Sequence, residues 1–256
     1  MSGPAFAIGG HEDREGERLI LRAVAAALPH PVLVVATVAS RRFPQDLFET
    51  YREAFAPMGV DVRHLGADHD TGDTAVLDGA GGVFFTGGDQ LRIVDVIGGT
   101  PLGDAIVRLW HGGAVVAGTS AGASVLGATM IGRGRGEESP TDDSVELEQG
   151  LGIVPSLVID QHFAERGRIG RLVAAVAAAP QSLGVGIDEN TAIDVRGDVF
   201  EVLGVGGVTV VDGAELRAVG EGEGGRVLSV TDVRAHLLAA GDRFDLAARH
   251  AVIRER

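Results

Sequence analysis

Short, almost wholly apolar runs alternate with helix-length amphipathic stretches over the first half of the chain. The apolar runs have the length and composition of strands that are covered on both faces; they are Ala5–Ile8, Val32–Val38, Val60–Leu65, Gly82–Gly88 and the start of Ala114–Gly122. Apolar spacing predicts helices at Ile20–Leu28, Pro44–Phe55 and Asp104–Trp110. This alternation predicts an α/β fold with a mostly parallel central sheet and helices on both of its faces.

The pattern changes after about residue 180, where β-branched runs separated by turn residues predict short strands and β-hairpins. We expect these C-terminal strands to extend the sheet, because no linker precedes them. The chain has 256 residues, and one domain takes about 100–200 residues or somewhat more. Residues 1–256 are therefore expected to form a single α/β domain.

The composition is that of an ordinary soluble protein, with 45% hydrophobic and 23% charged residues. Cysteine is absent, which excludes disulfides, thiolate metal sites and a cysteine nucleophile. All 22 residues in the Lys+Arg count are arginines, so a Schiff-base lysine and the lysine of a P-loop are excluded as well. The formal charge of −14 disfavours binding to nucleic acid or to an anionic membrane.

Two further features bear on location and cofactors. The N-terminal stretch lacks the basic and long apolar segments of a signal peptide, and no apolar run approaches the roughly 18 residues of a membrane-spanning helix. We therefore expect a cytoplasmic protein. The eight histidines show no ligand spacing such as H-E-x-x-H, so we expect neither a metal site nor a cofactor.

The first chemical motif is Gly118-Thr119-Ser120-Ala121-Gly122, a G-x-S-x-G pattern between an apolar run and a plausible helix. A sharp strand-to-helix turn of this kind holds the serine in strained backbone geometry and lifts its hydroxyl clear of the sheet. It also places the N–H of Ala121 beside the reaction centre. The pattern favours a nucleophile at Ser120, and a plain turn between strand and helix is the alternative.

A second motif, Phe84–Gln90, ends a buried strand in two glycines. These glycines could form a simple turn. Alternatively, Gly88 could direct its N–H at the serine and complete an oxyanion hole with Ala121, a type of donor that contributes about 10²–10³-fold in acyl transfer. Gln90 could then contact substrate.

A third motif, Ile159–Arg171, places His162 after an apolar run and spaces three arginines behind it. His162 is either a structural histidine or the base that serves Ser120. Arg168 and Arg171 share one face of a predicted helix near its N-terminus, where the helix dipole disfavours cations, whereas Arg166 must point elsewhere or precede the helix. A cluster that holds an anion explains this placement better than a solvated face.

A serine and a histidine still need a carboxylate that orients the imidazole. Asp188 and Glu189 both follow a further apolar run, and the residues alone leave the choice between them open. Ligand sites of open α/β sheets lie beyond the carboxyl ends of the strands. We therefore expect the serine, the histidine and the carboxylate to meet at the rim of one sheet.

One stretch without large apolar residues, 133–144, resembles a linker. It is either a mobile surface loop or a flap beside a cleft.

Together, the segments Phe85–Gln90, Gly118–Ser124, Asp160–Arg171 and Asp188–Ala192 resemble those of the cyanophycinases, in the serine peptidase family that also contains aspartyl dipeptidase. The serine turn is shared by the wider family, and the histidine with its three spaced arginines resembles the cyanophycinases in particular. The resemblance implies a flavodoxin-like three-layer fold, related to class I glutamine amidotransferases.

The resemblance also implies roles for individual residues. Ser120 would be the nucleophile, His162 the general base and Glu189 the orienting acid, while Gly88 and Ala121 would bind the oxyanion. The implied substrate-binding residues are Gln90, Asp160, Gln161, Arg166, Arg168 and Arg171.

The implied substrate is cyanophycin, a poly-aspartate with an arginine on each side-chain carboxyl, from whose backbone an exopeptidase would release β-Asp-Arg dipeptides. A homodimer is suggested only by this resemblance. Two other functions stay open: an aspartyl or β-aspartyl dipeptidase of the same family, and a non-catalytic binding or sensing protein.

Overall fold

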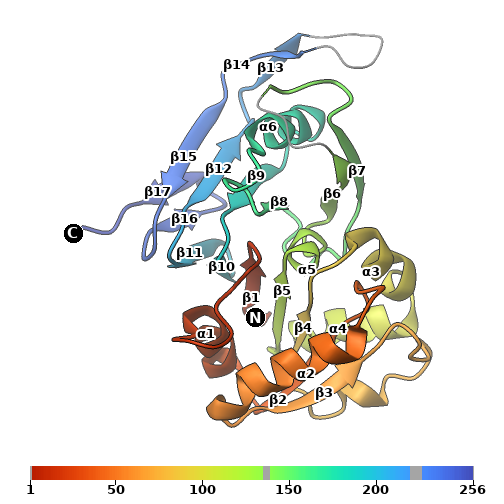
Figure 1. Cartoon of the computed structure of the whole chain (residues 1–256). Coiled ribbons are helices and arrows are strands. Elements are labelled where there is room, and N and C mark those ends of the chain that lie inside the picture. Colours follow the sequence, from red (N-terminus) through yellow and green to blue (C-terminus); the bar gives the residue numbers. More distant parts are fainter. Residues whose placement is uncertain (1, 135–138, 220–226, 256) are drawn as a thin grey trace.

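The computed structural model describes residues 2–134, 139–219 and 227–255, and its largest element is a nine-stranded sheet (Figure 1). The order of strands across this sheet is β17-β16-β11-β10-β1-β5-β4-β2-β3. Five neighbouring strands are parallel: β1 (Ala5–Ile8), β2 (Val32–Ala36), β3 (Asp61–Leu65), β4 (Gly82–Phe85) and β5 (Val115–Thr119). The other four are antiparallel: β10 (Thr191–Arg196), β11 (Val199–Gly204), β16 (Arg243–Asp245) and β17 (His250–Val252). The predicted α/β class with a parallel core is confirmed.

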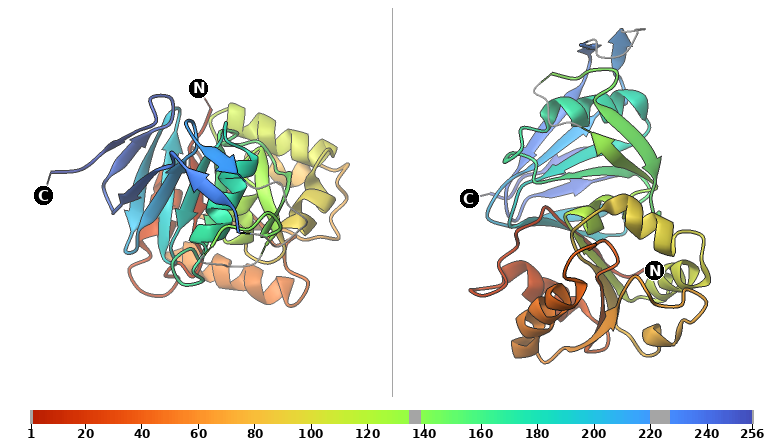
Figure 2. Two further views of the ribbon diagram at one scale, coloured as in Figure 1. Left: turned by 90° about the horizontal axis from the view of Figure 1, so that it is seen from above. Right: turned by 45° about the vertical axis from the view of Figure 1, so that its right-hand side comes forward.

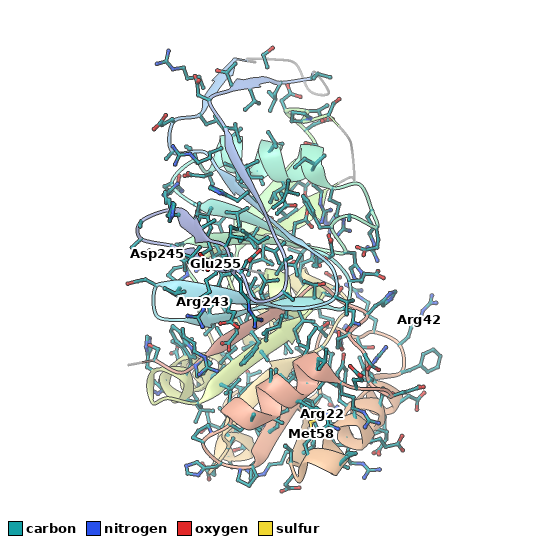
Figure 3. All side chains as sticks on the ribbon, turned by 90° about the vertical axis from the view of Figure 1, so that its left-hand side faces the viewer. Arg22, Arg42, Met58, Arg243, Asp245 and Glu255 are labelled. Carbon is teal, nitrogen blue, oxygen red and sulfur yellow. The ribbon has the colours of Figure 1, made fainter. Side chains whose placement is uncertain are left out.

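Helices cover both faces of the parallel strands, as the alternation of apolar runs predicts. Alternate side chains of a strand point to opposite faces. Phe6 of β1 packs with α1 (Leu19–Ala27) and α2 (Pro44–Phe55), whereas Ala7 belongs to the core cluster that includes α3 (Gln90–Ile97) and α4 (Pro101–His111). In Figure 3, Arg42 projects outward from the loop that precedes α2.

A second sheet of four strands has the order β15-β12-β9-β8. It contains β8 (Leu157–Gln161), β9 (Leu183–Ile187), β12 (Val208–Asp212) and β15 (Arg234–Leu238), with α6 (Ile169–Ala178) packed on it through Leu172 and Val176. In the right-hand view of Figure 2, this sheet and α6 lie above the parallel strands. The expectation that the strands after residue 180 extend the first sheet is therefore confirmed for β10 and β11 and wrong for β9 and β12. Their residue pattern predicts strands, but it does not specify their neighbours.

The elements between these two sheets are small. Helix α5 (Ala121–Ser124) follows β5, and β6 (Thr129–Gly134) pairs with β7 (Val145–Gln149). The remaining elements are β13 (Arg217–Val219), which pairs with β14 (Ser229–Thr231), and the 3-10 turns Ala56–Met58 and Ala75–Leu77. Of the predicted loop 133–144, residues 135–138 lie outside the described residues, Arg133 and Gly134 end β6, and Thr141 bridges to Val227.

No helix in the described part of the chain combines the length and the apolar character that crossing a bilayer requires. The longest of these helices, α2, has 12 residues.

Candidate active site

The G-x-S-x-G segment forms a tight turn from β5 into α5. Ser120 has a φ of 53° and a ψ of −116°, which a non-glycine residue adopts only under constraint. The flanking glycines make this turn possible because they allow a close approach of the backbone. A Cβ on Gly118 would lie 2.0 Å from the carbonyl oxygen of Gly122, and a Cβ on Gly122 would lie 2.2 Å from the carbonyl oxygen of Phe85. Both glycines are needed because backbone passes against backbone at these two points.

The glycine pair after β4 lies against this turn. A Cβ on Gly87 would lie 3.3 Å from the Cβ of Ser120, and Gly88 has a φ of 145°, which favours glycine. Gly88 also lines the same cavity as Ser120. The backbone of this loop therefore lies beside the serine.

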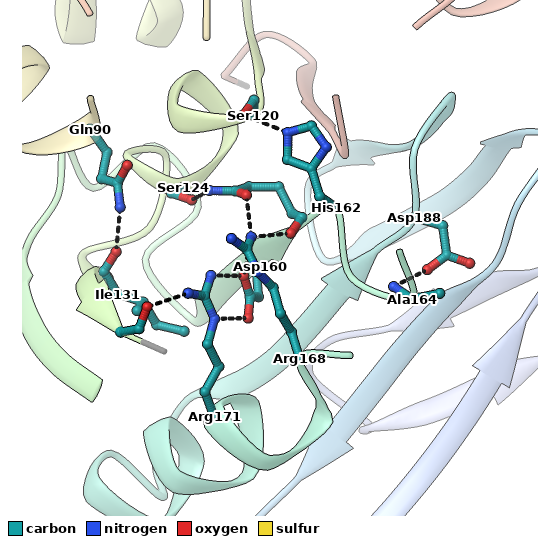
Figure 4. Close-up of polar contacts among 12 residues, drawn as sticks. Gln90, Ser120, Ser124, Ile131, Asp160, His162, Ala164, Arg168, Arg171 and Asp188 are labelled. Atoms are coloured by element: carbon teal, nitrogen blue, oxygen red, sulfur yellow. Dashed lines mark hydrogen bonds and ion pairs between the residues drawn. The ribbon is translucent and has the colours of Figure 1, made fainter. Parts of the chain in front are cut away.

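His162 follows β8 of the second sheet and faces Ser120. The serine hydroxyl lies 2.8 Å from Nε2 of the imidazole, and His162 is 4% exposed (Figure 4). Its backbone N–H donates to the carbonyl oxygen of Gly9 over 2.8 Å, which ties it to the end of β1. A Cβ on Gly10 would lie 2.3 Å from the imidazole, so only glycine leaves room for the ring.

The surroundings of His162 keep its imidazole neutral. Burial lowers its pKa from the ordinary value of 6.5, and the nearby charge of Arg166 lowers it further. The hydrogen bond to Glu189 raises the pKa but does not outweigh burial. A neutral imidazole has the lone pair that accepts a proton from the serine.

The two adjacent carboxylates after β9 have different partners. Oε1 of Glu189 accepts from Nδ1 of His162 over 2.6 Å, which completes a serine–histidine–glutamate chain. Burial raises the pKa of Glu189, but its hydrogen bonds with His162 and His11 have the larger combined effect and lower it. Asp188 instead accepts from the backbone N–H groups of Ala164 at 3.0 Å and Gly207 at 2.9 Å, so it fixes two loops.

The three groups do not meet at the rim of one sheet. Ser120 ends a strand of the nine-stranded sheet, whereas His162 and Glu189 follow strands of the four-stranded sheet. The expectation of a single sheet is wrong, and the site lies where the two sheets join. The turn from β9 to β10 passes from one sheet to the other and carries Glu189 with it.

His11 is a site residue that the sequence reasoning missed. Its Nδ1 lies 2.8 Å from Oε2 of Glu189, and its ring packs edge-on against that of His162 with centroids 5.2 Å apart. It follows β1, whose carboxyl end is next to that of β5 in the sheet. Polar residues that follow neighbouring parallel strands lie close together, so the position of His11 directly after β1 is the sequence signal that could have identified it.

The arginine cluster surrounds a buried carboxylate of the protein itself. Nε of Arg171 donates to Oδ2 of Asp160 over 2.7 Å, and a second hydrogen bond joins its Nη2 to Oδ1 (Figure 4). Arg168 donates to Oδ1 of Asp160 over 3.3 Å and to the side chain of Gln161. Burial lowers the pKa of Arg168 to about 10, so the guanidinium remains charged at neutral pH. Helix α6 begins at Ile169, so Arg166 precedes it.

A cavity of about 510 Å³ opens beside Ser120 on the arginine side. Among the described residues, the lining holds four arginines and no carboxylate: Gly88, Gln90, Ser120, Gly132, Arg133, Gly134, Gln161, Arg166, Arg168 and Arg171. The side-chain amide of Gln90 donates to the carbonyl oxygens of Ile131 and Gly132, which joins α3 to β6. Asp160 lies beneath this lining, with its side chain 0% exposed.

A second cavity, of about 230 Å³, lies on the other side of Ser120 and His162. It is lined in part by Glu12, Arg14 and Tyr51. Glu12 is 3% exposed and accepts from the hydroxyl of Tyr51 and, over 2.5 Å, from that of Thr119. Burial and the adjacent Glu12 raise the pKa of Tyr51, which therefore remains a protonated donor. Arg166 lines both cavities.

The fold and the site define an α/β protein in which a serine, a histidine and a glutamate form one hydrogen-bonded chain. The model of Peptidase family S51 matches residues 7–203, and the chain belongs to this family.

Relatives with names and solved structures agree with this membership. A protein of Trichormus variabilis named "Cyanophycinase" is 41% identical over 254 residues, covering 94% of this chain and 85% of that protein. One of the same name from Synechococcus elongatus is 37% identical over 255 residues, covering 95% and 79%. The crystal structure of a peptidase from an acI-B1 Actinobacterium has a TM-score of 0.68 at 22% identity and covers 96% of this chain and 97% of that one, which shows a common fold.

Proposed function

We propose that this protein is a serine-type peptidase that hydrolyses the poly-aspartate backbone of cyanophycin. The observation that carries the proposal is the chain of hydrogen bonds from Ser120 through His162 to Glu189. It is the arrangement that activates a serine in unrelated hydrolases. The relatives named "Cyanophycinase", which are 35–41% identical over most of the chain, support cyanophycin as the substrate.

The proposed reaction begins with proton transfer from Ser120 to Nε2 of His162, while the serine oxygen attacks a backbone carbonyl carbon. Glu189 stabilises the resulting imidazolium through Nδ1. The N–H groups of Gly88 and Ala121 would bind the oxyanion. His162 then protonates the departing amine, and a water molecule hydrolyses the acyl-enzyme by the same steps in reverse.

The arginine-lined cavity supports a substrate that offers carboxylates. Arg168, Arg171 and Asp160 together carry a net charge of +1, and the exposed Arg166 adds one more. Guanidinium groups bind carboxylates in a bidentate geometry. We propose that this excess charge holds a carboxylate near the end of the polymer, in which case the enzyme acts as an exopeptidase and releases β-Asp-Arg dipeptides.

The deciding experiment is incubation of the protein with purified cyanophycin, followed by mass analysis of the soluble products. β-Asp-Arg dipeptides that appear with the wild type and not with Ser120→Ala support the proposal. Insoluble polymer that stays unchanged, together with cleavage of short aspartyl or β-aspartyl peptides, would replace it by a dipeptidase. A protein that cleaves neither substrate and resists labelling of Ser120 by a fluorophosphonate would be a binding protein.

The resemblance to the cyanophycinases is also the ground for proposing a homodimer, which sedimentation of the purified protein would test. The cytoplasmic location stays a prediction.

A further inference from the structure

Glu189 serves two histidines at once. Its Oε1 accepts from His162 over 2.6 Å and its Oε2 accepts from His11 over 2.8 Å, in both cases from Nδ1. One nitrogen from each ring and one oxygen of the carboxylate all lie within 4.8 Å of one another. In the described part of the chain, this is the single group of histidines and carboxylates with such spacing.

We propose that His11, Glu189 and His162 form an inhibitory binding site for a divalent transition-metal cation of the Zn²⁺ class. Two imidazole nitrogens and one carboxylate oxygen are the ligands that Zn²⁺ prefers, whereas Mg²⁺ and Ca²⁺ prefer oxygen alone. Ligands of a tetrahedral Zn²⁺ with bonds of about 2.0–2.1 Å lie roughly 3.3 Å apart. The two nitrogen–oxygen pairs, now 2.6 and 2.8 Å apart, would therefore widen by about 0.5–0.7 Å as the cation replaces the hydrogen bonds.

The cation can enter from the His11 side. The side chain of His11 is 68% exposed and that of Glu189 is 25% exposed, whereas that of His162 is only 6% exposed. The site thus has an open outer ligand and a buried inner one, and a water molecule can take a fourth position.

The charges around the site permit a cation. Glu189 is one negative charge, and Glu165 adds another, because its Oε1 accepts from the backbone N–H of Glu189 over 3.2 Å. Arg166 opposes the cation from the segment after β8. From the segment after β1, Glu12 and Arg14 line the adjacent cavity and contribute opposite charges. The balance of these groups is one negative charge before the metal binds.

Metal binding would stop the proposed hydrolysis through a change of tautomer. In the resting site, Nδ1 of His162 holds a proton and Nε2 is the acceptor for Ser120. A metal on Nδ1 takes the lone pair at that position, so the ring proton moves to Nε2. The imidazole then donates to Ser120 and cannot take its proton. This step moves one proton within the ring of His162, and the oxidation state of the metal does not change.

The site itself is tested without substrate. Titration of the metal-free protein with Zn²⁺ by calorimetry, and with Co²⁺ by its visible absorption, should show one site per chain. His11→Ala should weaken binding by at least about tenfold, since a ligand is lost. His250→Ala, which removes an exposed histidine at the edge strand β17, should leave binding unchanged. Equal binding by wild type and His11→Ala would overturn the site.

The inhibition rests on the proposed function and has its own readout. Zn²⁺ should slow cyanophycin hydrolysis and the labelling of Ser120 by a fluorophosphonate, a chelator should restore both, and Mg²⁺ should do nothing. Each variant is compared with its own metal-free rate, because His11 also contacts Glu189. His11→Gln keeps a donor for Glu189 and should lose sensitivity to Zn²⁺. If Zn²⁺ binds but does not slow the labelling of Ser120, the inhibition is overturned and the metal site stands. If the protein does not hydrolyse cyanophycin, the proposed function fails, while the results of metal binding and of labelling remain valid.

Discussion

Ser120 and His162 face each other across the junction of two β-sheets, with 2.8 Å between the serine Oγ and the imidazole Nε2. The serine is fixed by the turn between β5 and α5, and the histidine by a hydrogen bond from its backbone to Gly9. Ser120 ends a strand of the nine-stranded sheet, whereas His162 follows β8 of the four-stranded sheet and is tied by Gly9 to the nine-stranded one. The packing of the two sheets therefore sets the distance between the pair.

The first prediction concerns Ser120→Ala. This variant should lose on the order of 10⁶ in kcat, as in other serine hydrolases when the nucleophile is removed. The side chain loses one oxygen, so the melting temperature should stay near that of the wild type. Turnover of cyanophycin by purified variant and wild type, with a thermal melt of each, checks both parts. Near-normal turnover would refute the role of Ser120.

The second prediction concerns the close backbone approach at Gly118. Gly118→Ala would place a Cβ 2.0 Å from the carbonyl oxygen of Gly122 and should destabilise the protein by about 3 kcal/mol or more. Gly72→Ala is the matched control, since its nearest neighbour is the flexible side chain of Asp70 at 3.2 Å. Urea unfolding of the two variants should differ clearly, and equal midpoints would contradict the proposed constraint.

The third prediction concerns pH. The proposed base must be neutral, and burial lowers the pKa of His162 below 6.5. Activity should therefore be retained as the pH falls to 6.5 and be lost only as it falls through the lowered pKa. A profile of kcat/KM against pH would show this acid limb. An apparent pKa at or above 6.5 would show that burial does not control the titration.

Arg166→Gln carries the fourth prediction. Arg166 lowers the pKa of His162 and lines both cavities, so the neutral variant should raise that pKa and move the acid limb to higher pH. Loss of a guanidinium should also raise KM. Arg42→Gln, at an exposed position before α2, is the control. An unchanged acid limb and KM would remove Arg166 from the site.

The fifth prediction separates Arg171 from Arg166. Arg171 is 5% exposed and pairs with the buried Asp160. Arg171→Ala would leave that carboxylate with Arg168 as its remaining cation, and removing one partner of a buried pair costs about 3–5 kcal/mol. Chemical unfolding should show that the free energy of unfolding falls by this amount in Arg171→Ala and by much less in Arg166→Ala. Similar decreases in the two variants would mean that the pairing of Arg171 with the buried Asp160 does not stabilise the fold.

Local features of the sequence predicted much of the fold. The helix Pro44–Phe55 has the predicted bounds, because a proline in the first turn and helical apolar spacing are local signals. The strand Ala5–Ile8 was also predicted correctly. Local patterns do not determine that β9 and β12 belong to a second sheet, because strand pairing depends on contacts between distant residues.

The candidate site divides in the same way. The G-x-S-x-G turn could be found because its strain is created by residues two positions apart. The choice between Asp188 and Glu189 could not be made from the residues, because adjacent side chains on an extended segment point in opposite directions. It depends on where the backbone of Ala164 and Gly207 lies, since those two N–H groups bind Asp188.

The sequence by itself determined the α/β class, the serine turn and the family to which the chain belongs, since these follow from apolar periodicity and from short motifs. Only the tertiary structure decided that the site lies between two sheets, that Asp160 is enclosed by two arginines, and that His11 shares Glu189 with His162. The physical reason is that each of these features depends on the distance between side chains from different strands, which the packing of the sheets fixes.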